Sequence, residues 1–284
     1  MVLVEKEIKP GVPMELSPLV TRIVAPNQSV MTGPGTNTYV IGRRELAVID
    51  PGPLSEIHTR RLLDLAESRQ GAIRWILCTH THKDHSPGAA PLNEATGATM
   101  LGMPAPDLDA AQDQTFTSDR PMAHGDVLET GDFTIEAVHT PGHVGNHLCF
   151  LLRDEGMLFT GDHINNGSTV VILPPSGHMG HYIRSLRLVK EVGATRIAPG
   201  HGEVMPEPDK VVDYLVAHRL RREDKVMTCL TRVGPCAVPE LVAHVYDDTP
   251  VYLHKLAQRS LLAHLIKLEE DGRVAIEDDR WRCV

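Results

Sequence analysis

The feature that most constrains the fold of this chain is a histidine-rich motif that directly follows an apolar strand. The strand is predicted over residues 73–78 (Ile-Arg-Trp-Ile-Leu-Cys), and the motif after it reads His80-Thr-His82-Lys-Asp84-His85. Side chains alternate in extended backbone, so His80 and His82 point the same way and can hold a single ion. Asp84 and His85 come where the chain turns away, so they can serve a second ion. The motif therefore predicts a metal site at the end of a buried strand.

Three later loops end strands in the same manner. His143, Asp162 and His201 each follow a short apolar strand and stand beside a glycine, which lets the backbone bend closely. The chain has 16 histidines, eleven of them between His80 and His201, and imidazole is the commonest metal ligand. One such loop is ordinary, but four in order on one α/β chain predict a common metal centre.

The residues around these loops indicate how the N-terminal part is built. Two apolar runs, Tyr39-Val-Ile and Leu46-Ala-Val-Ile, are separated by Gly42-Arg-Arg, which predicts a hairpin. Ser55 is placed to cap a helix that runs to about residue 69. The next strand then leads into the histidine motif.

With 284 residues, the chain is long enough for one large domain and one small one. Strands and helices alternate up to about residue 205, which predicts an α/β domain over residues 1–205. Residues 206–284 contain three segments with apolar side chains at a spacing of three to four, and then two short strands. Three helices and a terminal hairpin predict a winged-helix domain over residues 206–284.

The four loops resemble the metal-binding motifs of the metallo-beta-lactamase superfamily, in the right order and over about residues 17–205. The resemblance implies an αββα sandwich with the site at one edge. The ligands that it implies are His80, His82 and His143 for the first ion, Asp84, His85 and His201 for the second, and Asp162 as a bridge between them.

Two further features are similar to the beta-lactamase-like protein 2 group. One is Pro34-Gly-Thr-Asn-Thr-Tyr-Val ahead of an Asp50-Pro-Gly loop, and the other is the C-terminal winged helix with residues 249–254 and 261–272. These features extend the resemblance to nearly the whole chain. Members of the family include endoribonucleases, and relatives include acyl-carrier thioesterases. The resemblance therefore limits the chemistry more than the substrate.

The ligand types point to hydrolysis. Five imidazoles and two carboxylates suit two Zn²⁺ ions, although Mn²⁺ or Fe²⁺ also fits a mixed nitrogen and oxygen site. A metal pair lowers the pKa of water towards ~7 and so makes a nucleophile at neutral pH. Asp84 is expected to act in catalysis as well as in metal binding. His178 is expected to act as a further catalytic residue, because its glycine-rich loop can approach the site.

Three functions remain open at this level. The first is an endoribonuclease that cleaves single-stranded RNA, and the second is an acyl hydrolase acting on a thioester, lactone or lactam. The third is a non-catalytic nucleic-acid-binding regulator, against which the complete ligand set argues. Residues 206–284 carry 12 basic and 14 acidic side chains, without the clustering that phosphate binding needs. A packing or dimerisation role for this domain is simpler, so a homodimer is one expectation.

Composition sets the remaining expectations. The formal net charge of −9 disfavours a generic nucleic-acid scavenger, and no apolar run approaches the ~20 residues that span a bilayer. Five cysteines without framework spacing and an N-terminus without a signal-peptide core predict a reduced, cytoplasmic protein. Cys78 is expected in the core. Asn37 is expected either to donate a hydrogen bond near the metals or to be an ordinary turn asparagine with no role there.

Overall fold

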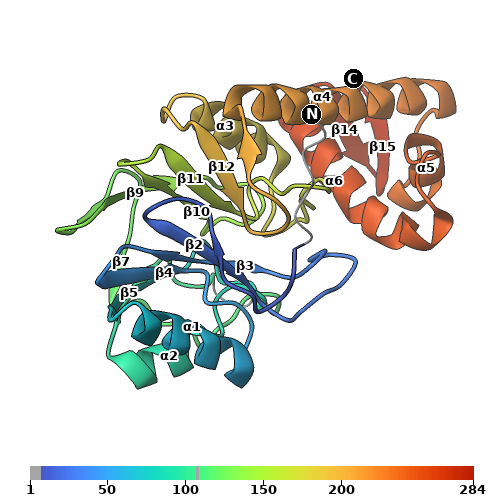
Figure 1. Ribbon diagram of the computed structural model, residues 1–284. Coiled ribbons are helices and arrows are strands. Elements are labelled where there is room, and N and C mark those ends of the chain that lie inside the picture. Colours follow the sequence, from blue (N-terminus) through green and yellow to red (C-terminus); the bar gives the residue numbers. More distant parts are fainter. Residues whose placement is uncertain (1–7, 107–108) are drawn as a thin grey trace, which may run out of the picture. The chain divides into compact units, whose positions relative to one another are not determined.

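The computed structural model describes residues 8–106 and 109–284, which form two compact units (Figure 1). The first unit holds the described residues up to His139, together with Asn146–Thr169 and Val192–Pro208. The second unit holds Thr140–Gly145, Val170–Glu191 and Asp209–Val284. These units are defined by contacts within each, and the expected domain boundary between residues 205 and 206 stays a prediction.

A seven-stranded sheet forms the first part of the first unit. Its strands lie in space in the order of the sequence. They are β1 (Met14–Glu15), β2 (Val20–Val24), β3 (Asn37–Ile41), β4 (Glu45–Ile49), β5 (Ala72–Leu77), β6 (Thr99–Gly102) and β7 (Arg120–Pro121). Strands β1 to β4 pair antiparallel, and β4 to β7 pair parallel. Helices α1 (Glu56–Ser68) and α2 (Ala89–Thr96) lie against one face of this sheet (Figure 1).

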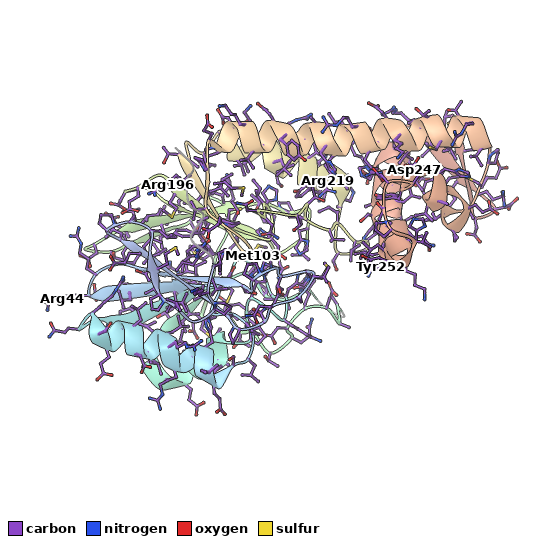
Figure 2. The ribbon with its side chains drawn as sticks, turned by 45° about the vertical axis from the view of Figure 1, so that its right-hand side comes forward. Arg44, Met103, Arg196, Arg219, Asp247 and Tyr252 are labelled. Carbon is purple, nitrogen blue, oxygen red and sulfur yellow. The ribbon has the colours of Figure 1, made fainter. Side chains whose placement is uncertain are left out.

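Local sequence accounts for the hairpin and the first helix. Gly42 begins the turn between β3 and β4 with φ +106°, where a Cβ would lie 2.3 Å from the Glu45 carbonyl oxygen, so only glycine fits. Arg44 in this turn is exposed and extends away from the sheet (Figure 2). Ser55 caps α1 by accepting a hydrogen bond from the His58 backbone N–H. The β4–α1–β5 crossover makes β4 and β5 parallel neighbours. Both the hairpin and the helix were predicted from the sequence.

The rest of the first unit is a six-stranded sheet in the order β13-β12-β11-β10-β9-β8. Its strands are β8 (Val127–Glu129), β9 (Thr134–His139), β10 (Leu148–Leu152), β11 (Met157–Gly161), β12 (Arg196–Pro199) and β13 (Met205–Pro206). Only β11 and β12 pair parallel; the other neighbours in this sheet are antiparallel.

An apolar core lies between the two sheets. The rings of Tyr39 in β3 and Phe159 in β11 have centroids 4.8 Å apart, and both residues are buried. The alternate positions of the same strands face the other way, where Val40 and Ile76 pack with Leu62 of α1. The N-terminal sheet is therefore apolar on both faces. Polar side chains that serve a site are left to the ends of the strands.

The second unit contains the C-terminal helices and hairpin. Its elements are α3 (Met179–Val189), α4 (Pro208–Val233), α5 (Val238–Val245), η1 (Val251–Leu253), α6 (His254–Glu270), β14 (Val274–Glu277) and β15 (Arg280–Cys283). Leu241, Leu261, Leu265 and Trp281 are buried together, so α5, α6 and the hairpin share one core. This is the winged helix predicted from the sequence.

Helix α3 also packs within the second unit. Arg219, labelled in Figure 2, extends from α4 with its guanidinium 5.1 Å from the centroid of the Tyr182 ring, and it donates a hydrogen bond to the Val170 carbonyl. Within residues 8–106 and 109–284, no helix combines the length and the apolar character that crossing a membrane requires.

Candidate metal centre

The candidate ligands of the first unit lie where neighbouring strands end. Ile49 of β4 pairs with Leu77 of β5, so the loops that follow these parallel strands start side by side. Asp50 begins one loop, and the other carries the histidine motif. In the second sheet, the parallel strands β11 and β12 deliver Asp162 and His201 in the same way. Carboxyl ends of parallel strands meet at one edge, which explains why residues far apart in the sequence gather there.

One group consists of four donor atoms. The Nε2 atom of His85 lies 3.4 Å from Asp84 Oδ2 and 3.5 Å from Asp162 Oδ1. The Nε2 atom of His201 lies 3.3 Å and 3.2 Å from the same two oxygens. In a tetrahedral zinc site with bonds of ~2.0–2.1 Å, donor atoms are separated by ~3.3–3.4 Å. These four nitrogen-to-oxygen distances therefore fit an ion of the size of zinc.

A second group adjoins the first. The Nε2 atom of His80 lies 2.9 Å from the Nδ1 atom of His82, and these two residues and Asp162 each place a donor atom within 4.8 Å of the others. The rings of His80 and His85 have centroids 4.3 Å apart. Asp162 therefore borders both groups. Burial lowers the pKa of His80 well below its usual range, and the neighbouring imidazoles lower it further, so this ring is neutral and able to bind a cation.

Asp50 orients both groups from behind, a role that the sequence analysis does not assign. Its Oδ2 atom accepts hydrogen bonds from His85 Nδ1 at 2.9 Å and from the Thr79 hydroxyl at 2.8 Å. Its Oδ1 atom accepts a hydrogen bond from the Thr79 backbone N–H at 2.7 Å. The Thr79 hydroxyl, having donated its proton, accepts from His80 Nδ1 at 3.0 Å. Asp50 therefore fixes the protonated nitrogen of both rings and leaves their Nε2 lone pairs facing the centre.

The charges of the centre support one another. Burial raises the pKa of Asp84 and Asp162, but His85 and His201 outweigh burial and lower both values below the usual range. Burial likewise opposes a charge on His201, yet the carboxylates raise its pKa to about 9. At His85 they also outweigh burial and raise the pKa well above its usual range. The two carboxylates thus stay ionised, as a cation site requires, and a bound cation takes the place of the imidazolium protons.

The two remaining predicted site residues belong to the second unit. His143 donates a hydrogen bond from Nδ1 to the Val171 carbonyl at 2.8 Å, which leaves the lone pair on Nε2. His178 caps α3, because its Nδ1 accepts from the His181 backbone N–H, and its Nε2 donates to Glu270 at 2.8 Å. The neutral ring satisfies both contacts. The catalytic roles of His178 and Asp84 stay predictions.

Other residues near the centre have structural roles. The side-chain amide of Asn37 donates to the carbonyls of Pro199 and Gly202, at 2.8 and 2.9 Å, and so holds the loop that carries His201. Asn37 therefore donates hydrogen bonds on both sides of a proposed metal ligand, His201. His147 is buried and stacks on the ring of His80 with a centroid distance of 5.0 Å. Cys78 is buried in the core, as expected.

Comparison with known protein families gives two matches. Residues 31–201 match the family described as the metallo-beta-lactamase superfamily, and residues 237–281 match the beta-lactamase associated winged helix domain. A Drosophila melanogaster protein named beta-lactamase-like protein 2 homolog is 30% identical over 272 residues, covering 92% of this chain and 91% of that protein. An Aspergillus chevalieri protein named atrochrysone carboxyl ACP thioesterase is 31% identical over 273 residues, covering 92% of this chain and 84% of that protein.

Solved structures show the same fold. A beta-lactamase domain protein from Burkholderia ambifaria has a TM-score of 0.82 at 18% identity and covers 99% of this chain and 96% of its own. A metallo-beta-lactamase family protein from Thermus thermophilus has a TM-score of 0.78 at 22% identity, with coverage of 95% and 100%. The fold class predicted from the sequence, with its C-terminal winged helix, is confirmed.

Proposed function

Because the chain belongs to the metallo-beta-lactamase superfamily and its strand ends gather a mixed imidazole and carboxylate centre, we propose that it is a dinuclear, zinc-dependent hydrolase. The observation that carries the proposal is the distance of 3.2–3.5 Å from the Nε2 atoms of His85 and His201 to carboxylate oxygens of Asp84 and Asp162. Members of the superfamily are mostly hydrolases. Zn²⁺ is the proposed metal, and Mn²⁺ or Fe²⁺ remains an alternative.

The proposed ligands follow the two groups of donor atoms. His80, His82 and His143 would hold the first ion. The Nδ1 atoms of His80 and His143 donate to Thr79 and to the Val171 carbonyl, which leaves a lone pair on each Nε2 atom. His82 presents its Nδ1 atom beside the Nε2 atom of His80. Asp84, His85 and His201 would hold the second. Asp162 would contact both ions, which fits its position next to members of both groups.

Zinc in such a site lowers the pKa of a water molecule to ~7 and polarises the oxygen of the bond to be broken. The chain contributes position and charge. Asp50 keeps the His80 and His85 rings in the orientation and tautomer that direct Nε2 into the centre. Asp84 is 29% exposed, against 14% for Asp162, so it is the carboxylate placed to orient an incoming water molecule.

Single-stranded RNA is the first substrate that we propose, in keeping with the endoribonucleases of the group that the sequence resembles. A phosphodiester brings its own negative charge to a cationic centre. An acyl substrate such as a thioester or lactone is the second proposal, and the Aspergillus chevalieri relative named as a thioesterase favours it. Cytoplasmic localisation and a homodimer stay predictions.

The test is to incubate metal-loaded protein with labelled single-stranded RNA, an acyl thioester and a lactone, with and without chelator. RNA cleavage that chelator and His80→Ala both abolish supports the first proposal. Intact RNA together with acyl turnover at kcat/KM of ~10⁴ M⁻¹s⁻¹ or more supports the second. If chelator removes the metal without affecting an activity, the metal centre is not what catalyses that reaction. If the metal-loaded protein turns over none of the three substrates, the non-catalytic regulator becomes the better explanation.

A further inference from the structure

Helix α3 exposes a row of two arginines and one histidine that the proposed hydrolysis does not use. His181, Arg184 and Arg187 recur every three residues, so they lie along one face of the helix, and all three are exposed. We call these three residues the α3 row. Met179–Val189 contains no acidic residue, in a chain whose formal net charge is −9. The row is therefore a local reversal of the overall charge.

The two arginines of the α3 row have no acidic partner. In the described part of the chain, neither guanidinium forms an ion pair, whereas four other arginines of the same unit do. Those four are Arg222, Arg273, Arg280 and Arg282. Arg187 lies in the last turn of α3, where a cation favours the helix dipole by ~0.3–1 kcal/mol. That explanation does not extend to Arg184, which lies in the middle of the helix.

The α3 row borders a hollow in the second unit. Its volume is about 500 Å³, within the ~300–1,000 Å³ range of pockets that take a small ligand or one unit of a polymer. Pro141 and Leu188 contribute apolar lining, and Glu191 is the acidic residue of the lining. Cationic groups beside an apolar hollow can bind a phosphate and shelter the base or sugar attached to it.

A flat ring completes this surface. His181 stacks on His178 with centroids 4.1 Å apart and an angle of 24° between the rings. Histidine rings are among the side chains on which unpaired bases stack. Single-stranded nucleic acid binds to surfaces that combine positive charge along the backbone with such platforms. An acidic protein bound at the same surface would contact the arginines, but it would not require the histidine ring or the hollow.

The α3 row is also held in a fixed relation to a proposed metal ligand. Ser185 donates a hydrogen bond to the Pro141 carbonyl at 2.7 Å, and the His178 N–H donates to the Gly142 carbonyl at 2.8 Å. A Cβ on Gly142 would lie 2.3 Å from the Tyr182 Cα, so the helix and this loop touch backbone to backbone. The same short loop carries His143. A chain bound along α3 is thereby positioned relative to a ligand of the first ion.

We propose that the α3 row and its hollow bind the sugar-phosphate backbone of single-stranded RNA. The inference rests on the proposed function, because it takes RNA as the substrate. It goes further by assigning the contact to α3 rather than to the winged helix. Arg184 and Arg187 each engage one phosphate.

The experiment measures binding separately from cleavage. A fluorescent single-stranded RNA with 2′-O-methyl groups is titrated with metal-loaded protein at several salt concentrations, and gel electrophoresis of each sample verifies that the RNA stays uncleaved during the titration. The test variant is Arg184→Gln/Arg187→Gln. The matched control is Arg232→Gln/Lys255→Gln, which removes two charges from exposed sites elsewhere in the same unit. Metal content and thermal unfolding establish that each variant is intact.

The expected result is specific to the α3 variant. Each phosphate contact on a single strand contributes ~0.7 to the slope of log affinity against log salt, so loss of two contacts lowers the slope by ~1.4. Affinity at low salt should fall at least ~10-fold, and the control should stay within about twofold of the wild type. An unchanged slope in an intact α3 variant, or a reduced slope in the control instead, overturns the proposal.

Other outcomes separate the inference from the proposed function. If the wild type binds the RNA through Arg184 and Arg187 but does not cleave unmodified RNA, the surface stands and the endoribonuclease proposal fails. If RNA is cleaved with the same salt dependence by wild type and α3 variant, the inference alone fails. If the variant binds RNA normally but acts more slowly on a thioester carried by an acidic protein, the surface docks a protein and the proposal is wrong.

Discussion

Replacing Asp50 with asparagine is expected to weaken metal binding although Asp50 is not itself a proposed ligand. Asp50 has φ +50°, a conformation that asparagine adopts readily, so the backbone should not change. The carboxylate accepts three hydrogen bonds and donates none. An amide must present an N–H₂ group to at least one of these donors. Facing such a group, His85 would carry its proton on Nε2, which is the atom that would bind the ion.

The size of the effect follows from the contacts. Substitution of residues that orient metal ligands costs 10–100-fold in affinity, or ~1.4–2.7 kcal/mol. Two hydrogen bonds reach Asp50 Oδ2, and each bond to a charged acceptor contributes ~1.5–3 kcal/mol. Their sum, ~3–6 kcal/mol, is an upper limit for the combined loss of stability and metal affinity. Both ions should be affected, because one bond leads to His85 and the other leads through Thr79 to His80.

The assay is competition for zinc between the protein and a chromophoric chelator. Thr79→Val removes only the path to His80, so it should weaken the first ion more than the second. Asp113→Asn is the matched control, since Asp113 is a buried aspartate that accepts hydrogen bonds from Ser86 and Thr115. Zinc affinity within twofold of the wild type in an intact Asp50→Asn protein would refute this account of the centre.

Three further predictions concern the metals and stability. Protein purified without chelator should contain two metal ions per chain by elemental analysis; a reproducible value near one contradicts the dinuclear proposal. Asp162→Asn should lower turnover ~10²-fold or more while the fold persists, because an amide cannot offset the charge of two cations; full activity with both metals retained would be the contrary result. Burial, together with nearby cations, lowers the pKa of His264 to about 3. The His264 ring therefore stays neutral in the folded state but takes up a proton below pH ~6.5 in the unfolded state. The free energy of unfolding that the neutral His264 contributes is therefore lost as pH falls, by about 2 kcal/mol at pH 5. His264→Gln should flatten the decline in urea-unfolding free energy between pH 8 and 5. An equal decline in the wild type and the variant would contradict this role of His264.

Local signals in the sequence predicted much of the fold. The apolar runs on either side of Gly42 predicted the hairpin, and Ser55 predicted the start of α1. Strand β6 was not predicted, because Thr99–Gly102 is only four residues long and its apolar character is no greater than that of a loop. The membership of α3 in the second unit was also beyond prediction, since it depends on contacts such as that between Arg219 and the Tyr182 ring.

The candidate site was predictable where the ligands follow strands in sequence. His80 and His82 are two residues apart on an extended chain, and period-two alternation brings them together. From the sequence, Asp50 was noted only as the first residue of an Asp50-Pro-Gly loop, yet it contacts His85 across 35 positions. The signal was present in the β-α-β order, which makes β4 and β5 parallel neighbours and places the residues after them side by side. His147 carried no such signal, because its stacking on His80 depends on the facing of two sheets.

Ionic strength separates the two proposed substrates without any substitution. A formal net charge of −9 repels a polyanion at long range, and salt screens that repulsion beyond ~10 Å at 0.1 M. If overall charge dominated, kcat/KM for RNA would therefore rise with salt. If the α3 row holds the backbone, released counterions dominate, and kcat/KM falls with a slope of at least ~1.4 on logarithmic axes. A neutral thioester should respond little in either case. We expect a fall for RNA, measured from about 25 to about 300 mM salt with metal content held constant; a rise would place the binding surface outside α3.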